Sequence, residues 1–298
     1  MFQGFRLERL GVGALTLRTR IGGSGPPLLL LHGHPQTHVM WHRVAPMLAE
    51  QFTVVAVDLP GYGQSSAPPT AADHTQASKR AMALVMLDLM TLLGFSRFGV
   101  TGHDRGGRMA YRLALDHPAA VAGLAVLDIV PTSVVWAHMD AELAHEFWHW
   151  LFLARPAPVP ERLLTADPEA YYFSDDRSMF APDALDDYLA ACRQPGTIHT
   201  MCEDYRAGAT IDRALDDADM AADRRIRGPI LALWSKSERH ERWYDPLEVW
   251  RSWAADPAAV RGRAIEAGHY LAEEAPEEVA AELSAFFDGA TRRLGHRP

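Results

Sequence analysis

The chain has 298 residues, of which 48% are hydrophobic and 22% are charged, so it has a globular composition and the length of one large domain or two small ones. Its 29 basic and 38 acidic residues leave a net charge of -9, which argues against nucleic acid as a partner. The longest strongly apolar run, residues 26–31, is far below the roughly 18 residues that span a bilayer, and the N-terminus lacks a signal-peptide apolar core. The two cysteines, Cys192 and Cys202, have no metal-binding spacing, so we expect free thiols in a cytoplasmic protein.

Short apolar runs recur along the chain and predict strands that are buried on both faces, as in a parallel sheet. These runs are residues 27–32, 52–58, 98–102, 123–128 and 229–234, with 263–266 as a last edge strand. Helical patterns separate them, notably at residues 76–93, 106–115 and 276–287. Strands and helices that alternate in this way predict a doubly wound α/β sheet.

The alternation stops between residues 131 and 227, where the chain is rich in Trp, Tyr, His and Met. Helical patterns there cover residues 140–152, 182–192 and 211–219, and no segment reads as a strand. We interpret this stretch as a helical cap inserted after a strand. The predicted division is therefore a core formed by residues 1–130 and 228–298, with a cap at 131–227.

One tight turn carries the most chemical information. Gly102-His103-Asp104-Arg105-Gly106 follows a predicted strand and opens a predicted helix, in the G-x-nucleophile-x-G pattern with Asp in place of Ser. The glycines permit a sharp turn that lifts the central side chain above the sheet, at a helix N-terminus that favours an anion. A carboxylate so placed can attack an sp³ carbon and form an ester. The structural alternative is an N-capping Asp in a glycine-rich turn.

Two other segments fit the same chemistry. His32-Gly33-His34-Pro35 follows the first strong strand, and such a loop supplies a backbone N–H, here that of His34, to an oxyanion hole. The N–H of Arg105, directly after the candidate nucleophile, would be the second donor. Downstream, Gly268-His269-Tyr270 follows the last short strand, and the order of nucleophile and then His favours His269 as a general base.

Together with their surroundings, these residues resemble the fluoroacetate dehalogenase family of α/β-hydrolases, a branch of the haloalkane dehalogenase and epoxide hydrolase group. Short patterns such as HGxP and GxDxG are shared by many hydrolases, whereas the paired arginines after Asp104 and the CEDYRAG segment are much narrower. The matching segments span nearly the whole chain: residues 32–43, 58–63, 101–108, 127–132, 149–150, 154–158, 201–208 and 268–271. The resemblance implies an α/β-hydrolase fold, with a mostly parallel sheet and a helical cap, that hydrolyses short 2-haloacids through an aspartyl ester.

The resemblance also implies the catalytic roles. Asp104 would displace halide from the α-carbon, and His269 would activate the water that hydrolyses the resulting ester. Asp128 would orient His269 from the end of its strand. The other common place for this acid is after the next strand, where the chain offers Glu238 beside Lys236 and Ser237.

Binding roles follow from the same resemblance. Arg105 and Arg108 have an i, i+3 spacing that puts both on one helix face, where they would bind the substrate carboxylate. Otherwise, they form structural ion pairs. In the cap, His149, Trp150 and Tyr205 would donate hydrogen bonds to the departing halide. The alternative for these aromatic residues is cap packing.

The chain departs from the family pattern in three places. His34 stands where the family usually has Phe, and Gly107 replaces an Ala. Residues 171–180 are unlike the corresponding segment of the family's substrate tunnel. These departures leave the substrate size and the preferred halide open, rather than the reaction type.

Two rival functions remain. An epoxide hydrolase would use the same Asp and His with cap phenols to protonate an alkoxide, but a neutral epoxide gives no reason for two arginines beside the nucleophile. The candidate phenols are those of Tyr171, Tyr172, Tyr188 and Tyr205. A non-catalytic ligand-binding protein of the same fold would be expected to lack part of the Asp104, His269 and Asp128 set, which is complete.

No motif demands a cofactor. His145 and His149 have the i, i+4 spacing of a helical metal site, but a third ligand is not evident, so we predict no metal. The expected partners are a small haloacid substrate and a second copy of the chain in a homodimer, with neither nucleic acid nor membrane.

Overall fold

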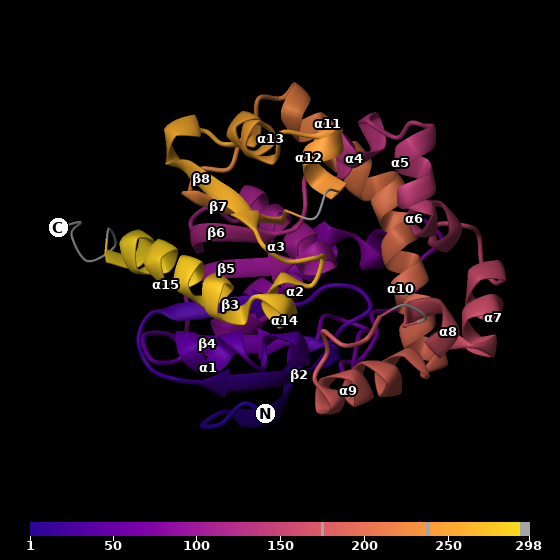
Figure 1. Cartoon of the computed structure of the whole chain (residues 1–298), viewed down its shortest axis with the longest axis horizontal. Helices are drawn as coiled ribbons and strands as arrows, with labels where there is room; N and C mark the ends of the chain where they lie inside the picture. The colour runs from indigo at the N-terminus through magenta and orange to yellow at the C-terminus, as the bar shows by residue number, and fades with distance from the viewer. Residues whose placement is uncertain (174–175, 237–238, 293–298) are drawn as a thin grey trace.

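The computed structural model describes residues 1–173, 176–236 and 239–292 and is built around one eight-stranded sheet (Figure 1). The strand order is β1-β2-β4-β3-β5-β6-β7-β8. The strands are β1 Arg6–Val12, β2 Leu15–Gly22, β3 Pro27–Leu31, β4 Thr53–Val57, β5 Phe98–His103, β6 Val121–Leu127, β7 Ile230–Ser235 and β8 Val260–Ile265. From β4 to β8 the neighbours pair in parallel, whereas β1 and β2 are antiparallel. The predicted mostly parallel α/β sheet is confirmed.

All six predicted strands are present, with β8 at the edge of the sheet. The hairpin formed by β1 and β2 is not among the predicted strands. Its strands carry charged residues such as Arg6, Glu8 and Arg20 in place of a continuous apolar run, because much of β1 faces solvent. A strand exposed on one face gives an alternating signal, which is weaker than that of a strand buried on both faces.

Helices cover both faces of the sheet. In Figure 1, α15 lies in front of the strands, while α2 and α3 lie behind them. The helices are α1 Val44–Leu48, α2 Lys79–Leu92, α3 Asp104–Asp116, α4 Thr132–Ala137, α5 Ala141–Glu146, α6 Trp148–Leu153, α7 Val159–Ala166, α8 Pro168–Tyr172, α9 Pro182–Cys192, α10 Pro195–Ala207, α11 Arg213–Ala221, α12 Arg239–Trp243, α13 Pro246–Trp253, α14 Leu271–Glu274 and α15 Pro276–Arg292. Short 3-10 turns occupy His38–Trp41, Thr75–Ala77 and Pro257–Ala259, and Gly208–Asp212 forms a π-helical turn. None of the described helices is both long and apolar enough to cross a bilayer.

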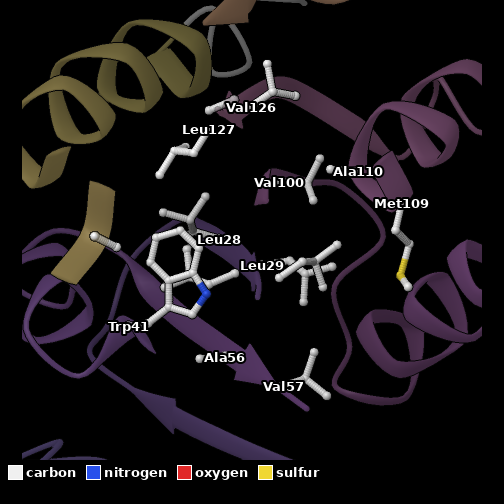
Figure 2. Packing of buried hydrophobic residues seen from close by; sticks show 14 of the residues in the cluster. Leu28, Leu29, Trp41, Ala56, Val57, Val100, Met109, Ala110, Val126 and Leu127 are labelled. Atoms are coloured by element: carbon white, nitrogen blue, oxygen red, sulfur yellow. The ribbon is translucent and has the colours of Figure 1, made fainter. Parts of the chain in front are cut away.

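The core forms where the central strands meet these helices. Leu28 and Leu29 of β3 are fully buried, and Figure 2 shows Trp41 and Met109 on opposite sides of them. Successive side chains of a strand point to opposite faces, so β3 must be apolar throughout. Burying each such side chain stabilises the fold by about 1.5–3 kcal/mol, which makes the central strands a rigid base for the loops at their ends.

In the described part of the chain between β6 and β7 the named elements are all helices, joined by turns and loops, and α5 to α10 gather on the right of Figure 1. The predicted helix over 182–192 is present as α9, whereas the one over 140–152 is broken at Phe147 into α5 and α6. The Phe147 ring packs against Trp150 and Trp243, with centroids 6.0 and 6.4 Å away, so tertiary packing overrides the helical pattern. The break puts the two histidines with i, i+4 spacing on different helices. The boundaries of the cap at residues 131 and 227 remain our proposal.

Candidate active site

The predicted sharp turn joins β5 to α3 and presents Asp104 at the carboxyl edge of the sheet. Asp104 has a φ of 45°, in the left-handed region that non-glycine residues rarely adopt. A Cβ on Gly102 would lie 2.4 Å from the carbonyl carbon of Gly106, so glycine is required for this approach. The strained backbone is held by the buried strand on one side and the helix on the other.

The Asp104 side chain is 8% exposed and accepts a hydrogen bond from the backbone N–H of His34 (2.9 Å to Oδ1). The N–H of Arg105, in the first turn of α3, has no partner within its own helix and is a second donor by position. Burial acts to raise the pKa of Asp104, but its electrostatic interactions with the neighbouring imidazoles, His269 foremost, and with the two arginines outweigh burial and hold this pKa below its usual range. Asp104 is therefore an anion at neutral pH.

His269 follows β8 and lies beside Asp128, as the sequence analysis predicts. Its Nδ1–H donates to Asp128 Oδ2 at 2.6 Å, which leaves Nε2 as the basic nitrogen. The second oxygen of Asp128 accepts from the backbone N–H of Ser235 at 2.8 Å. Glu238, the alternative acid, lies outside the described residues together with Ser237, while Lys236 pairs with Glu266 at the surface.

The two arginines have different surroundings. The Arg105 guanidinium is fully buried and donates to the Asp204 carboxylate and to the Asp204 carbonyl oxygen (2.8 Å). Asp204 also accepts from Lys79 and from the Tyr62 hydroxyl (2.8 Å). Arg105 is therefore anchored by a structural ion pair, which was the alternative reading of its position in the sequence.

Arg108 lines the cavity that contains Asp104. Its Nη1 donates to the Val130 carbonyl oxygen (2.9 Å) and to Thr132 Oγ1 (3.2 Å), and its guanidinium lies 4.5 Å from the centre of the Trp150 ring. Within the described part of the chain no carboxylate forms an ion pair with Arg108, and its Nε and Nη2 make no hydrogen bond. This buried cation therefore has no direct ion pair with a described carboxylate, although the charge of Asp104 in the same cavity acts on it.

Two cap helices bring the three predicted halide donors together. His149 and Trp150 come from α6 and Tyr205 from α10, and the Tyr205 ring lies 5.8 and 6.0 Å from the other two rings. All three line the cavity with Asp104. In the described structure the indole N–H of Trp150 and the hydroxyl of Tyr205 have no protein acceptor, and burial raises the pKa of Tyr205, so its hydroxyl stays protonated. Both groups can donate to a ligand.

The cavity has a volume of about 440 Å³. His34, Tyr171, Tyr172 and Tyr244 also line the cavity, whereas Tyr188 does not. Three of the four phenols considered for epoxide opening are therefore present in one site. Among the described residues no group of His, Cys, Asp or Glu side chains has an arrangement that could hold a metal ion, and both cysteines are free and buried.

Comparison with known proteins gives the family. A model of the alpha/beta hydrolase fold matches residues 26–276 of the chain. Fluoroacetate dehalogenase from Burkholderia sp is 43% identical over 297 residues, which cover 97% of this chain and 96% of the relative. The chain belongs to the alpha/beta hydrolase family. The family resemblance drawn from the sequence is confirmed.

This alpha/beta hydrolase is similar to enzymes of a second kind as well. Soluble epoxide hydrolase from Corynebacterium sp. (strain C12) is 31% identical over 275 residues, which cover 89% of this chain and 91% of the relative. A solved structure from Pseudomonas aeruginosa, provisionally described as an epoxide hydrolase, superimposes with a TM-score of 0.92 and 44% identity, covering 99% of each chain. The comparisons therefore give the fold and the hydrolase family, while two substrate classes occur among the relatives.

Three polar residues of this alpha/beta hydrolase site are additions to the sequence analysis. Asp204 and Lys79 complete the ion cluster around Arg105, and Asp204 lies within the matched CEDYRAG segment. His103 donates from Nε2 to the backbone carbonyl oxygen of His269 (2.8 Å), and burial lowers its pKa to about 4, so it is neutral. No motif distinguishes Lys79, because its role depends on a contact across 125 positions of sequence.

Proposed function

We propose that this alpha/beta hydrolase dehalogenates short 2-haloacids by hydrolysis, converting haloacetate and water to glycolate, halide and a proton, with fluoroacetate among its substrates. The observation that carries the proposal is the buried Arg108 guanidinium, which lines the cavity with Asp104 and forms no direct ion pair with a described carboxylate. A buried charge is expensive unless a counterion accompanies it, so the site favours an anionic ligand. A substrate carboxylate held by Arg108 would supply that counterion and bring the adjacent α-carbon to Asp104.

The first step follows from the state of Asp104. As an anion, it attacks the α-carbon in line with the carbon–halogen bond, forms a C–O bond and expels halide with the bonding electron pair. Trp150 and Tyr205 donate hydrogen bonds to the departing halide from the cap, together with His149. Because charge moves from carboxylate to halide, donors that strengthen as the halide becomes an anion lower the barrier.

The second step regenerates the enzyme. His269 takes a proton from water through Nε2, and the water oxygen attacks the carbonyl carbon of the Asp104 ester. Asp128 stabilises the imidazolium through Nδ1–H. The negative oxygen of the tetrahedral intermediate is stabilised by the N–H of His34, which already donates to Asp104 in the free enzyme, and by that of Arg105. Collapse of the intermediate releases glycolate and restores the carboxylate.

Epoxide hydrolysis is the second candidate function. The hydroxyls of Tyr171, Tyr172 and Tyr205 belong to residues of the same cavity and could protonate an epoxide oxygen during ring opening. Two relatives described as epoxide hydrolases share most of the chain. A neutral epoxide, however, leaves the buried Arg108 without a direct ion-pair partner, and this is why we rank epoxide hydrolysis second.

The deciding experiment compares substrates that differ in charge. We would measure halide release from chloroacetate, fluoroacetate and the neutral analogue chloroacetamide, and diol formation from glycidol. Arg108→Gln should lower kcat/KM for chloroacetate about ten- to a hundredfold, because a charge-assisted contact is worth about 1.5–3 kcal/mol. The loss for chloroacetamide should be small. Turnover of glycidol without halide release from any acid, or equal losses on the two chloro compounds, would contradict the proposal.

A further inference from the structure

The side chain of His34 is a polar wall of the cavity with no protein partner. It is 9% exposed, and its two ring nitrogens form no hydrogen bond with any described residue. The ring packs edge-on between Tyr172 and Tyr205, with centroids 5.1 and 5.2 Å away. These ring contacts fix the orientation of the imidazole and leave its hydrogen-bonding capacity unused.

Two neighbouring hydroxyls share this property. The hydroxyl oxygens of Tyr171 and Tyr172 are buried and have no partner within the described residues, and the two rings lie 4.8 Å apart at a right angle. Both residues line the cavity with His34. Buried polar groups in native proteins are nearly always satisfied, so a cluster of unsatisfied ones at a cavity wall indicates that a ligand or ordered water completes it.

All three side chains are uncharged at neutral pH. Burial lowers the pKa of His34 to about 3, so its imidazole offers one N–H donor and one nitrogen acceptor. Burial raises the pKa of Tyr171 and of Tyr172, so both keep their protons. This cluster of neutral donors and acceptors suits a neutral ligand group that both donates and accepts hydrogen bonds, as a hydroxyl does. A second carboxylate would lack a counterion here.

The position of His34 says which part of a substrate would reach this wall. The backbone N–H of His34 donates to Asp104 Oδ1, so the His34 side chain extends from a point next to the nucleophile. The substrate carbon that Asp104 attacks would therefore lie close to this side chain. The cavity volume of about 440 Å³ falls within the roughly 300–1,000 Å³ of pockets that bind much larger ligands than a two-carbon acid. A substituent on the α-carbon therefore has both space and polar neighbours.

We propose that His34, Tyr171 and Tyr172 form a subsite for a hydroxyl group on the β-carbon, so that the preferred substrates are 2-halo-3-hydroxy acids. This inference rests on the proposed dehalogenase function and adds the substrate class. The substitution chemistry is unchanged: Asp104 displaces halide from C2, water hydrolyses the ester, and the C3 hydroxyl remains in the product, a 2,3-dihydroxy acid.

The test uses two substrates of equal heavy-atom number, 2-chloro-3-hydroxypropanoate and 2-chlorobutanoate, which differ by a hydroxyl against a methyl group. Chloride release is measured at neutral pH for both and for chloroacetate, with an enzyme-free sample to correct for spontaneous ring closure of the hydroxy acid. We expect kcat/KM to favour the hydroxy acid about tenfold, the effect of one or two neutral hydrogen bonds. A ratio of one or below, with chloroacetate still turned over, overturns the subsite while leaving the dehalogenase proposal intact.

Variants then assign the preference to the cluster. His34→Phe and Tyr172→Phe keep the rings but remove the polar atoms, and each should move the ratio of the two kcat/KM values toward one. Because the readout is a ratio, a general loss of activity in either variant does not imitate the result. Tyr244→Phe is the matched control, since it removes a phenol hydroxyl from the same cavity at a residue outside the three-residue cluster, whose ring packs against His138, and it should leave the ratio unchanged. An unchanged ratio in both cluster variants contradicts the inference. If the enzyme releases no chloride from any of the three acids, both the inference and the proposed function are wrong.

Discussion

Arg105 and Arg108 lie one helical turn apart in α3, yet their charges are balanced differently. Asp204 pairs with Arg105 and shares its carboxylate with Lys79, and a second carboxylate of this cluster, that of Asp212, accepts from the backbone N–H of Lys79 (2.8 Å). Arg108 adds a further cation, whose pKa is lowered by burial and by the charge of Arg105. We infer that Arg105 sets the local potential while Arg108 makes the direct contact with a substrate carboxylate, a division that i, i+3 spacing alone does not predict.

The ester mechanism predicts a covalent intermediate when His269 is replaced. His269→Ala should complete the first step and stall before the second, because no base remains to activate water. Mixing this variant with chloroacetate should release about one chloride per site and add the mass of a carboxymethyl group to the peptide that contains Asp104, as read by mass spectrometry. Asp104→Asn is the control and should give neither product. If mass spectrometry shows that the Asn has not deamidated to Asp and this variant still turns over, the mechanism is wrong.

The cap donors predict selectivity between halides. Fluoride accepts hydrogen bonds more strongly than chloride, so removing the Tyr205 hydroxyl should slow fluoroacetate more than chloroacetate. For Tyr205→Phe the loss on fluoroacetate has an upper limit of about 2.7–4 kcal/mol, the effect of one donor in a well-formed oxyanion site. Steady-state rates with both substrates provide the measurement. Equal slowing of the two would show that the halide contact lies elsewhere in the cap.

At the scale of elements, the helix after His269 is tied to the cap through a buried carboxyl group. Glu273 of α14 accepts from the Tyr188 hydroxyl of α9, and Gln36 Nε2 lies 3.5 Å from the same oxygen. His42 lies 3.7 Å from the other oxygen, and Arg43 donates to the backbone carbonyl of Glu273 at 3.0 Å. Burial raises the pKa of Glu273 to about 7, which favours the neutral acid in the folded state.

This carboxyl group predicts how stability depends on pH. Between its ordinary pKa of 4.5 and about 7 the folded state keeps a proton that the unfolded chain has lost, so the Glu273 contribution to stability falls as pH rises through this window. Glu273→Gln, which cannot ionise, should therefore gain stability relative to the natural chain by roughly 3 kcal/mol between pH 4 and pH 8. Denaturant unfolding at each pH measures the difference, and the exposed Glu277→Gln provides the control. A pH-independent difference would mean that the pKa of Glu273 is the same in the folded and unfolded protein.

At the scale of the whole molecule, one ion pair links helix α9 to strand β2 of the sheet. Both guanidinium nitrogens of Arg18 in β2 donate to Asp187 of α9, at 3.1 and 2.8 Å, and Thr37 Oγ1 donates to the same carboxylate at 2.6 Å. Thr37 follows the loop whose His34 N–H contacts Asp104. A single carboxylate thus connects the N-terminal hairpin, the segment that follows His34, and helix α9.

Removing that carboxylate should loosen the cap. Asp187→Ala should lower the free energy of unfolding by about 2 kcal/mol, because hydrogen bonds to charged groups contribute about 1.5–3 kcal/mol and Arg18 is left with weaker pairing to Asp58 at 3.5 Å. Amide hydrogen exchange should accelerate in α9 more than in the central strands. Asp186→Ala is the matched control, since Asp186 lies exposed on the same helix. Equal protection of α9 in the two variants would show that the link is not needed to hold the cap.

Sequence patterns are sufficient to predict the central strands, the Asp104 turn and the loops that carry His34 and His269. These features depend on local physical causes: an apolar run that must be buried on both faces, and a backbone turn that admits only glycine at its ends. The parallel sheet then brings the carboxyl ends of its strands to one edge, where His269 meets Asp128, a pairing that the family resemblance implies.

Contacts between segments far apart in the chain could not be predicted from sequence patterns. The pairing of Arg105 with Asp204 joins residues 99 positions apart, and the break of the predicted cap helix at Phe147 follows from packing against Trp243. Neither leaves a periodic signal, because the energy of each contact is set by which segments the folded chain places side by side. The same holds for the polar wall formed by His34, Tyr171 and Tyr172: their residue types are visible in the sequence, but the lack of protein partners exists only in the packed cavity.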